Sequence, residues 1–147
     1  MRRVLASLFV VAGLALVVTA TGSAAGDAAT VKTRHGKLGT FLVGTNGRTL
    51  YLFEKDKTKK STCSGDCATA WPPLLTTGKP KAAGKAKASL LGTTKRADGK
   101  TQVTYKGHPV YYFVQDKKAG DTKGQGIDGF GAEWYVMSPS GKKIDED

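Results

Sequence analysis

The chain has 147 residues, with 23 lysines and arginines against 12 aspartates and glutamates, which gives a formal net charge of +11 at pH 7. This length suits one domain with a modest hydrophobic core. Two cysteines, two histidines and the absence of a C-x-x-C-H sequence argue against haem and zinc proteins, so we expect no cofactor and no bound metal.

The N-terminus has the order of segments that is typical of a secretory signal peptide. Two arginines follow Met1, residues 4–18 form an apolar run, and small residues occupy 23–25. We therefore assign residues 1–25 to a signal peptide that is cleaved after Ala25. The apolar run is short for a membrane span, and no cysteine near the cleavage site is available for a lipid. The sequence predicts a secreted protein, free or associated with the cell wall, without a stable membrane span.

Turn residues divide the remaining chain into short strands. Residues 26–35 are expected to form a flexible segment, and residues 36–147 a single β domain. It comprises a first repeat at about 36–75, a mobile Lys/Ala/Gly linker at 76–88 and a second repeat at about 89–144. Asn-Gly at 46–47 and Asp-Gly at 98–99 favour tight hairpins between apolar runs. The expected strands are 38–44, 48–54, 90–96, 101–106, 109–115, 133–138 and 142–144.

Two stretches of the chain are related to each other. Residues 47–57 and 107–117 share Gly, Tyr, Phe, Asp and Lys at matching places, with an offset of 60 residues (107 − 47). Upstream, Leu-Gly-Thr at 38–40 and at 91–93 match at a smaller offset. This difference predicts an insertion of seven or eight residues at 100–106 in the second copy. Self-similarity of this kind predicts two similar structural units.

The repeated strands are apolar on both faces. Side chains alternate along a strand, so Tyr51 and Phe53 point to one face and the neighbouring leucines point to the other; Tyr111 and Phe113 follow the same pattern. Such a strand needs cover on both sides. The sequence therefore predicts an all-β fold, a small antiparallel barrel or sandwich of two degenerate hairpin repeats about a pseudo-twofold axis.

Cys63 and Cys67 are expected to form a disulfide, because nearby cysteines pair in an oxidising compartment. Loop-closure entropy in so small a ring stabilises the fold by about 2 kcal/mol. We expect one short helical turn at 66–71. A redox or metal-handling role for the pair, with His108 as a partner, stays open as the alternative, although C-x3-C lacks the thioredoxin spacing.

Tryptophans and aspartates occupy matching places in the two units. Trp71 and Trp134 are predicted to pack in the core, although Trp71 before two prolines also suits a carbohydrate or proline-rich ligand platform. Asp56 and Asp116 each end a repeated strand, where an aspartate commonly accepts backbone N–H groups. Catalysis of hydrolysis by the two carboxylates is the alternative. No nucleophile has a visible partner, so we predict no catalytic residue and no enzyme activity.

The loop at 116–131 holds three aspartates and five glycines. Carboxylates and carbonyls in such a loop can hold a calcium ion, but the order of ligands in the known helical calcium loop is absent. We expect a folded surface loop, and cation binding remains an alternative.

The repeated motifs resemble those of a known bacterial family. Residues 51–56 and 111–116 both fit Y-x-[FWY]-x-x-D, residues 63–74 read C-x-G-x-C-A-x-x-W-P-P-L, and residues 124–136 read G-Q-G-x-x-G-F-G-x-x-W-Y-V. These motifs are similar to the secreted-repeat family of unknown function, predicted lipoproteins with the Y-x-[FWY]-x-x-D motif, over nearly all of residues 36–140. The resemblance implies export and a repeat architecture, but no reaction. Many members are lipid-anchored, and this chain differs in lacking a cysteine at the cleavage site.

Lysines dominate the positive charge and suggest a ligand. A positive field attracts polyanions over a Debye length of about 8 Å at physiological salt. Outside a cell, the expected partner is an anionic cell-wall polymer or an envelope protein rather than nucleic acid, and we expect a monomer. The leading hypothesis is an exported, non-catalytic repeat domain at the envelope. Its candidate anion-binding residues are Lys57, Lys59, Lys60, Lys79, Lys81, Lys85 and Lys87.

Overall fold

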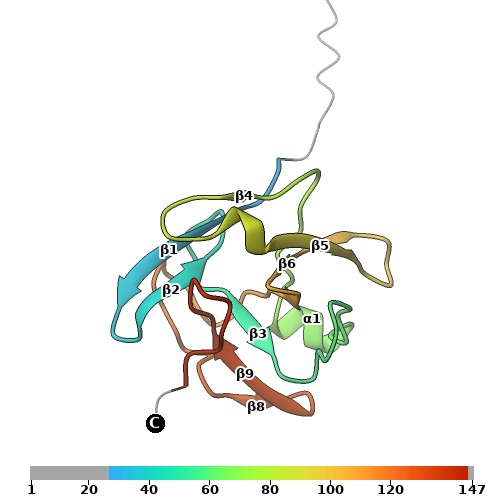
Figure 1. The fold of residues 1–147 in the computed structure, drawn as a ribbon. Coiled ribbons are helices and arrows are strands. Elements are labelled where there is room, and N and C mark those ends of the chain that lie inside the picture. The colour runs from blue at the N-terminus through green and yellow to red at the C-terminus, as the bar shows by residue number, and fades with distance from the viewer. Residues whose placement is uncertain (1–26, 146–147) are drawn as a thin grey trace, which may run out of the picture.

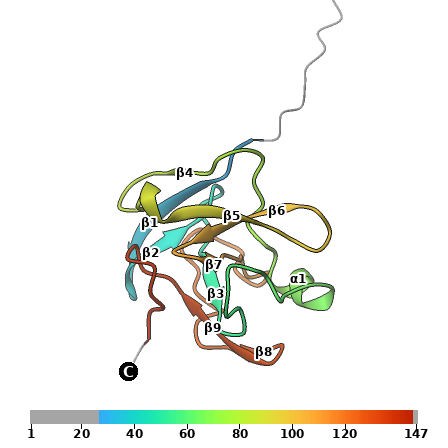
Figure 2. The same cartoon turned by 45° about the vertical axis from the view of Figure 1, so that its right-hand side comes forward.

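The computed structural model describes residues 27–145, so the predicted signal peptide lies outside the described residues. The described chain is mostly β-structure and forms three small sheets of three strands each (Figures 1 and 2). The sheets do not close into a barrel and fit a small sandwich, which confirms the predicted fold class. Among these residues, no helix is long and apolar enough to cross a membrane.

The first sheet has the order β2-β1-β4. β1 (Thr30–Gly36) and β2 (Gly39–Val43) form an antiparallel hairpin, and β4 (Lys81–Ala82) runs parallel to β1. From Thr30 onward, the segment expected to be flexible is therefore a strand paired on both sides, which corrects the prediction for 26–35. The predicted linker is likewise attached to this strand, because Lys81 N donates to Ala29 O at 2.8 Å and Ala83 N to Val31 O at 2.9 Å.

The other two sheets have the orders β5-β6-β7 and β3-β9-β8. A 3₁₀ turn at Ala88–Leu90 leads into β5, and the predicted helical turn is confirmed as α1 (Asp66–Ala70). The predicted strand at 142–144 is reduced to a single bridge between Met137 and Lys143. The strands of these two sheets are β3 (Tyr51–Phe53), β5 (Leu91–Lys95), β6 (Thr101–Tyr105), β7 (His108–Pro109), β8 (Asp128–Gly129) and β9 (Ala132–Val136).

The hairpins β1-β2 and β5-β6 are equivalent elements of the two repeats. Each is followed by the segment that carries the repeated tyrosine, which is β3 in the first repeat and the residues after β7 in the second, and the backbone pairing has the same pattern in both. The predicted insertion at 100–106 is wrong, because residues 101–105 form β6, the counterpart of β2. The offset of 60 residues thus extends back to the start of both hairpins. In the first repeat, Val43 pairs with Lys32 and with Thr49. In the second repeat, Thr104 pairs in the same way with Gly92 and with Pro109.

The two repeats exchange strands at the centre of the molecule. β3 of the first repeat pairs with β9 of the second, with Phe53 opposite Trp134. In the reverse sense, residues 110–114 of the second repeat bond to residues 70–74 of the first. Tyr51 and Tyr111 exchange both backbone hydrogen bonds, at 2.8 and 3.0 Å. The pseudo-twofold axis therefore passes between these two tyrosines, and the sheet β3-β9-β8 contains strands of both repeats.

Both faces of the exchanged strands are buried, as predicted. One face belongs to a cluster that includes Leu50, Leu52 and Val110, and the other to an aromatic cluster. In the aromatic cluster, four rings from alternating repeats stack with centroid separations of 4.0, 4.0 and 4.2 Å. Stacked aromatic pairs add to the stabilisation from area burial alone. The stack runs in the order Phe53, Trp134, Trp71 and Phe113.

Gly124 lies against this stack and provides a test of it. A Cβ atom added to Gly124 would come within 2.8 Å of the Trp71 ring and 2.9 Å of the Tyr51 ring. Gly124→Ala should therefore lower the free energy of unfolding by about 1–3 kcal/mol, since a packed core relaxes poorly around an added methyl group. The check is urea denaturation followed by tryptophan fluorescence.

Gly129→Ala is the matched control, because the nearest atom to its added Cβ is at 3.8 Å. It should change stability by less than about 1 kcal/mol. Equal losses in the two variants would contradict the close packing described for the stack.

Candidate functional site

The repeated tyrosines and aspartates form two crossed hydrogen bonds at the pseudo-twofold axis. Tyr51 Oη donates to Asp116 Oδ2 at 2.6 Å, and Tyr111 Oη donates to Asp56 Oδ2 at 2.6 Å. Each bond joins the tyrosine of one repeat to the aspartate of the other. The two copies of the motif therefore depend on each other, because the tyrosine of each copy donates the hydrogen bond that the aspartate of the opposite copy accepts.

Further hydrogen-bond donors, backbone N–H groups and one hydroxyl, satisfy the second oxygen of each carboxylate. Asp56 Oδ1 accepts from the N–H and the hydroxyl of Thr62, at 2.7 and 2.6 Å, and Asp116 Oδ1 accepts from Lys123 N at 2.9 Å. Both aspartates therefore close the loop that follows their strand, which is the structural role predicted from the sequence. Asp56 is 5% exposed and Asp116 is fully buried.

Burial raises the pKa of Asp116 and of both tyrosines, which favours their neutral forms. Loss of solvation is the main cause that raises the pKa of Asp116 above its ordinary value, with the Tyr51 hydrogen bond opposing it. Desolvation first, and then the hydrogen bond to an aspartate, raises the pKa of Tyr51 and of Tyr111 far above the usual range of a tyrosine. Both hydroxyls therefore remain protonated donors at any physiological pH.

The two carboxylates do not share a cleft. Asp56 borders a surface hollow of about 550 Å³ together with Lys57 and His108, whereas Asp116 borders none of the hollows described for the chain. A pair of hydrolytic carboxylates must face one substrate from both sides. The observed arrangement holds two strands together and presents no such pair to a substrate.

The predicted disulfide between Cys63 and Cys67 is confirmed, with Cα atoms 5.2 Å apart. Both cysteines are buried in the aromatic cluster. Reactive cysteines are partly exposed, so this buried position suits a brace rather than a redox centre. His108 borders the hollow beside Asp56, and Cys63 borders a different one, so the structure does not bring His108 to the cysteine pair.

The tryptophans pack in the core, and the glycine-rich loop is closed by its own hydrogen bonds. Trp71 and Trp134 are buried, so neither ring is offered to an external ligand. In the loop, Asp121 accepts from the N–H groups of Lys117 and Lys118, each at 3.1 Å. Within residues 27–145, no cluster of three or more His, Cys, Asp and Glu side chains is arranged to hold a metal ion.

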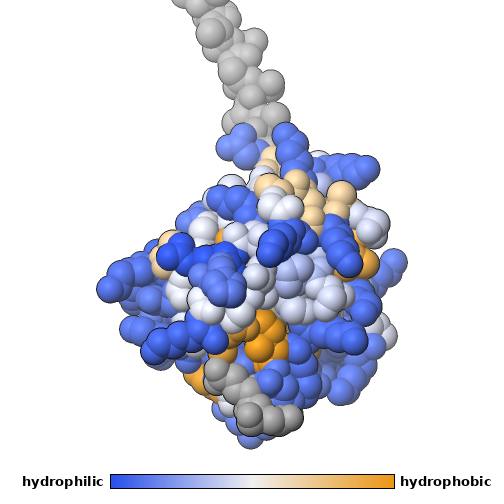
Figure 3. Space-filling view, turned by 60° about the vertical axis from the view of Figure 1, so that its left-hand side comes forward, coloured by the Kyte–Doolittle hydropathy of each residue, from blue (hydrophilic) through white to orange (hydrophobic). Residues whose placement is uncertain are grey.

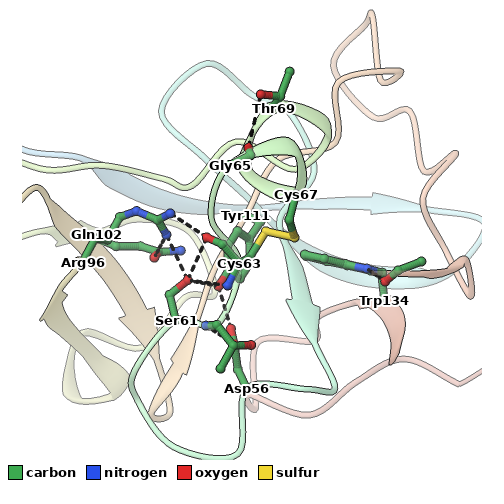
Figure 4. Close-up of a disulfide and its surroundings, with 12 residues drawn as sticks. Asp56, Ser61, Cys63, Gly65, Cys67, Thr69, Arg96, Gln102, Tyr111 and Trp134 are labelled. Atoms are coloured by element: carbon green, nitrogen blue, oxygen red, sulfur yellow. Dashed lines mark hydrogen bonds between the residues drawn. A yellow bond between two sulfur atoms is a disulfide. The ribbon is translucent and has the colours of Figure 1, made fainter. Parts of the chain in front are cut away.

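A polar network beside the disulfide was not predicted from the sequence (Figure 4). Arg96 donates through Nη1 to Ser61 Oγ at 3.0 Å and to Gln102 Oε1 at 2.8 Å, and through Nη2 to Cys63 O at 2.6 Å. Ser61 in turn contacts Tyr111 Oη at 2.7 Å. The network thus leads from a half-buried arginine at the surface to the crossed bonds in the core.

This network breaks the symmetry of the two repeats. In the first repeat the places of Arg96 and Gln102 are taken by Gly36 and by the buried ring of Phe41, as the equivalent strand pairing shows. On that side, Tyr51 Oη accepts from Gly124 N at 3.1 Å, and no arginine is involved. A purely structural repeat needs no such difference. The correct alignment of the hairpins would have revealed this difference in the sequence, but the matches at 38–40 and 91–93 concealed it.

Tyr51→Phe tests the crossed bonds directly. The substitution leaves the fully buried Asp116 without its side-chain donor, so it should lower the free energy of unfolding by about 1–3 kcal/mol. Tyr111→Phe should have an effect of similar size, because Asp56 then loses the matching donor. Tyr112→Phe, which changes a tyrosine that meets no carboxylate, is the control. Chemical denaturation measures all three, and an effect of Tyr51→Phe no larger than that of the control would contradict the assigned role.

Comparison with known proteins supports the repeat interpretation. A family model described as "Secreted repeat of unknown function" matches residues 32–75 and 92–138, which together make up more than half of the chain. The two matches begin 60 residues apart (92 − 32), at Lys32 and Gly92, which are equivalent residues of the paired hairpins. No match was found among curated proteins or among solved structures. The chain belongs to the family of secreted repeats of unknown function.

Proposed function

We propose that this protein is an exported, non-catalytic repeat domain that binds anionic polymers of the cell envelope through its lysines. The observation that carries the proposal is the contrast between the core and the surface. The motif's tyrosines and aspartates are bonded to one another in the core, whereas the lysines project into solvent. A secreted family and a disulfide both fit an oxidising compartment outside the cell.

The lysines are largely free of partners. Within residues 27–145, only Lys143 lies within 4.0 Å of a carboxylate, with Glu54 at 3.2 Å and Asp145 at 3.5 Å. Hydrophilic side chains cover most of the face seen in Figure 3. A surface of uncompensated lysines attracts a polyanion and displaces its counterions, so the attraction weakens as salt rises.

The candidate lysines form two separate groups. Lys57, Lys59 and Lys60 lie in the loop after β3, while the lysines of residues 79–87 lie on and around β4, at the opposite end of the molecule in Figures 1 and 2. A small anion could contact only one group. A long polymer could contact both, and its affinity would rise through multivalent attachment.

Retention on purified cell wall at increasing salt tests the proposal. The wild-type protein should bind at low salt and be released progressively as ionic strength rises. Replacement of Lys57, Lys59 and Lys60 by glutamine should lower the salt concentration needed for release, because these exposed side chains have no carboxylate partner to lose.

The matched control replaces three lysines outside both groups, Lys37, Lys117 and Lys118, and therefore removes the same charge. It should shift release less than the triple variant of the loop. Retention that does not respond to salt, or no retention at all, would contradict the proposed function.

A further inference from the structure

The guanidinium of Arg96 is held in one orientation with one edge free. Ser61 Oγ and Cys63 O, which lie 3.3 Å apart, accept from Nη1 and Nη2 at the end of the guanidinium, and Gln102 takes the second N–H of Nη1. An arginine has five N–H groups. The two that have no partner among the described residues belong to Nε and Nη2, and these nitrogens form the remaining edge of the group.

This arginine also lacks a counter-ion. It is half-buried, and within residues 27–145 no carboxylate lies within 4.0 Å of it. It lines a hollow of about 450 Å³, within the range of about 300–1,000 Å³ that is usual for small-molecule sites. The other walls come from residues 61–65, Ala68, Ala97 and Asp98. In Figure 4 the guanidinium lies beside the segment that carries Cys63 and Gly65.

The free edge suits an oxyanion with two oxygens in reach. Two parallel N–H groups match two oxygens of a carboxylate or of a phosphodiester. Asp98 borders the same hollow, and its Oδ1 is engaged by Lys100 N at 2.9 Å. Its negative charge opposes any anion there, and it opposes a phosphomonoester dianion more strongly than a carboxylate or a phosphodiester, which carry a single charge.

Lysines lie next to the residues of this hollow in the sequence. Lys59 and Lys60 immediately precede Ser61, and Lys95 and Lys100 lie on either side of the turn that carries Arg96. A polymer with a carboxylate on each sugar could place one group on Arg96 and its neighbours near these lysines. The exposed hydroxyl of Ser64 is available for the hydroxyls of the sugar.

We propose that the hollow beside Arg96 binds one singly charged oxyanion group of an envelope polymer, a carboxylate or a phosphodiester, through the free edge of the guanidinium. This inference rests on the proposed function, since it names the place at which a charged group of the polymer that the lysines attract is recognised. It also accounts for the broken symmetry, because only the second repeat replaces the glycine and phenylalanine of the first with an arginine and a glutamine.

Calorimetry with defined oligomers tests the inference. The probes are trigalacturonate, its methyl ester and a glycerol phosphate oligomer of equal charge. The wild-type protein should bind trigalacturonate and the phosphate oligomer, should not bind the ester, and the ratio of the two affinities shows which oxyanion the hollow prefers. Arg96→Lys keeps the charge but removes the bidentate edge, so it should weaken the binding of both oligomers about tenfold or more.

Two further variants keep the test decisive. Asp98→Asn retains an oxygen for Lys100 N and removes the opposing charge, so it should tighten trigalacturonate binding about threefold. This variant decides the outcome if Arg96→Lys does not fold, as thermal unfolding will show. Lys37→Gln, in the equivalent hairpin of the first repeat on the other side of the molecule, is the charge control and should have a smaller effect than Arg96→Lys (Figure 1).

The outcomes separate the inference from the proposed function. Binding of the ester as tight as that of trigalacturonate, a loss in a folded Arg96→Lys no larger than that in Lys37→Gln, or no gain in Asp98→Asn would overturn the oxyanion site and leave the polymer proposal standing. Failure of every polyanion to bind would overturn both.

Discussion

Two hydrogen bonds between the repeats determine how this small molecule is organised. A buried carboxylate is costly unless donors satisfy it, and the donor that completes each of Asp56 and Asp116 is a tyrosine from the opposite repeat. Neither repeat can satisfy its own aspartate, so the two must fold against each other. The exchange of β3 and β9 and the alternating order of the aromatic stack then follow from the same pseudo-twofold arrangement. The disulfide braces one loop of this arrangement, and both of its cysteines are buried.

This organisation directs attention away from the motif when function is considered. The residues that repeat most clearly are buried in the core. Their hydrogen-bonding groups are paired with one another there, so none is left to bind a ligand. The informative positions are those at which the repeats differ. At Arg96 and Gln102 the second repeat has a polar pair in place of Gly36 and Phe41, and this pair connects the core to a surface hollow. A repeat protein can keep one copy of a feature for structure and change the other for recognition.

Much of the fold could be predicted because its signals are local. The Asn-Gly turn, the alternation around Tyr51 and Phe53 and the close cysteines each report on a few neighbouring residues, and the structure has the hairpin, the buried strand and the disulfide that they predict. The pairing of Tyr51 with Asp116 joins residues 65 apart and leaves no local trace. β1 and β4 were missed because their apolar signal is weak and their order comes from pairing, of β1 with β2 and of β1 with β4. The site at Arg96 was missed because the alignment of the two hairpins was displaced.

The most direct test of the crossed bonds is an NMR titration of the tyrosine ring carbons, assigned by substitution, from neutral to alkaline pH. An ordinary tyrosine ionises near pH 10. Because burial and the aspartate partner raise the pKa of Tyr51 and Tyr111, both should remain protonated above that pH for as long as the protein is folded. The unfolded chain would ionise there, so the stability that these groups contribute is complete below pH 10 and declines above it. Titration of either tyrosine near pH 10 in the folded protein would show that the crossed bonds do not hold the two repeats together.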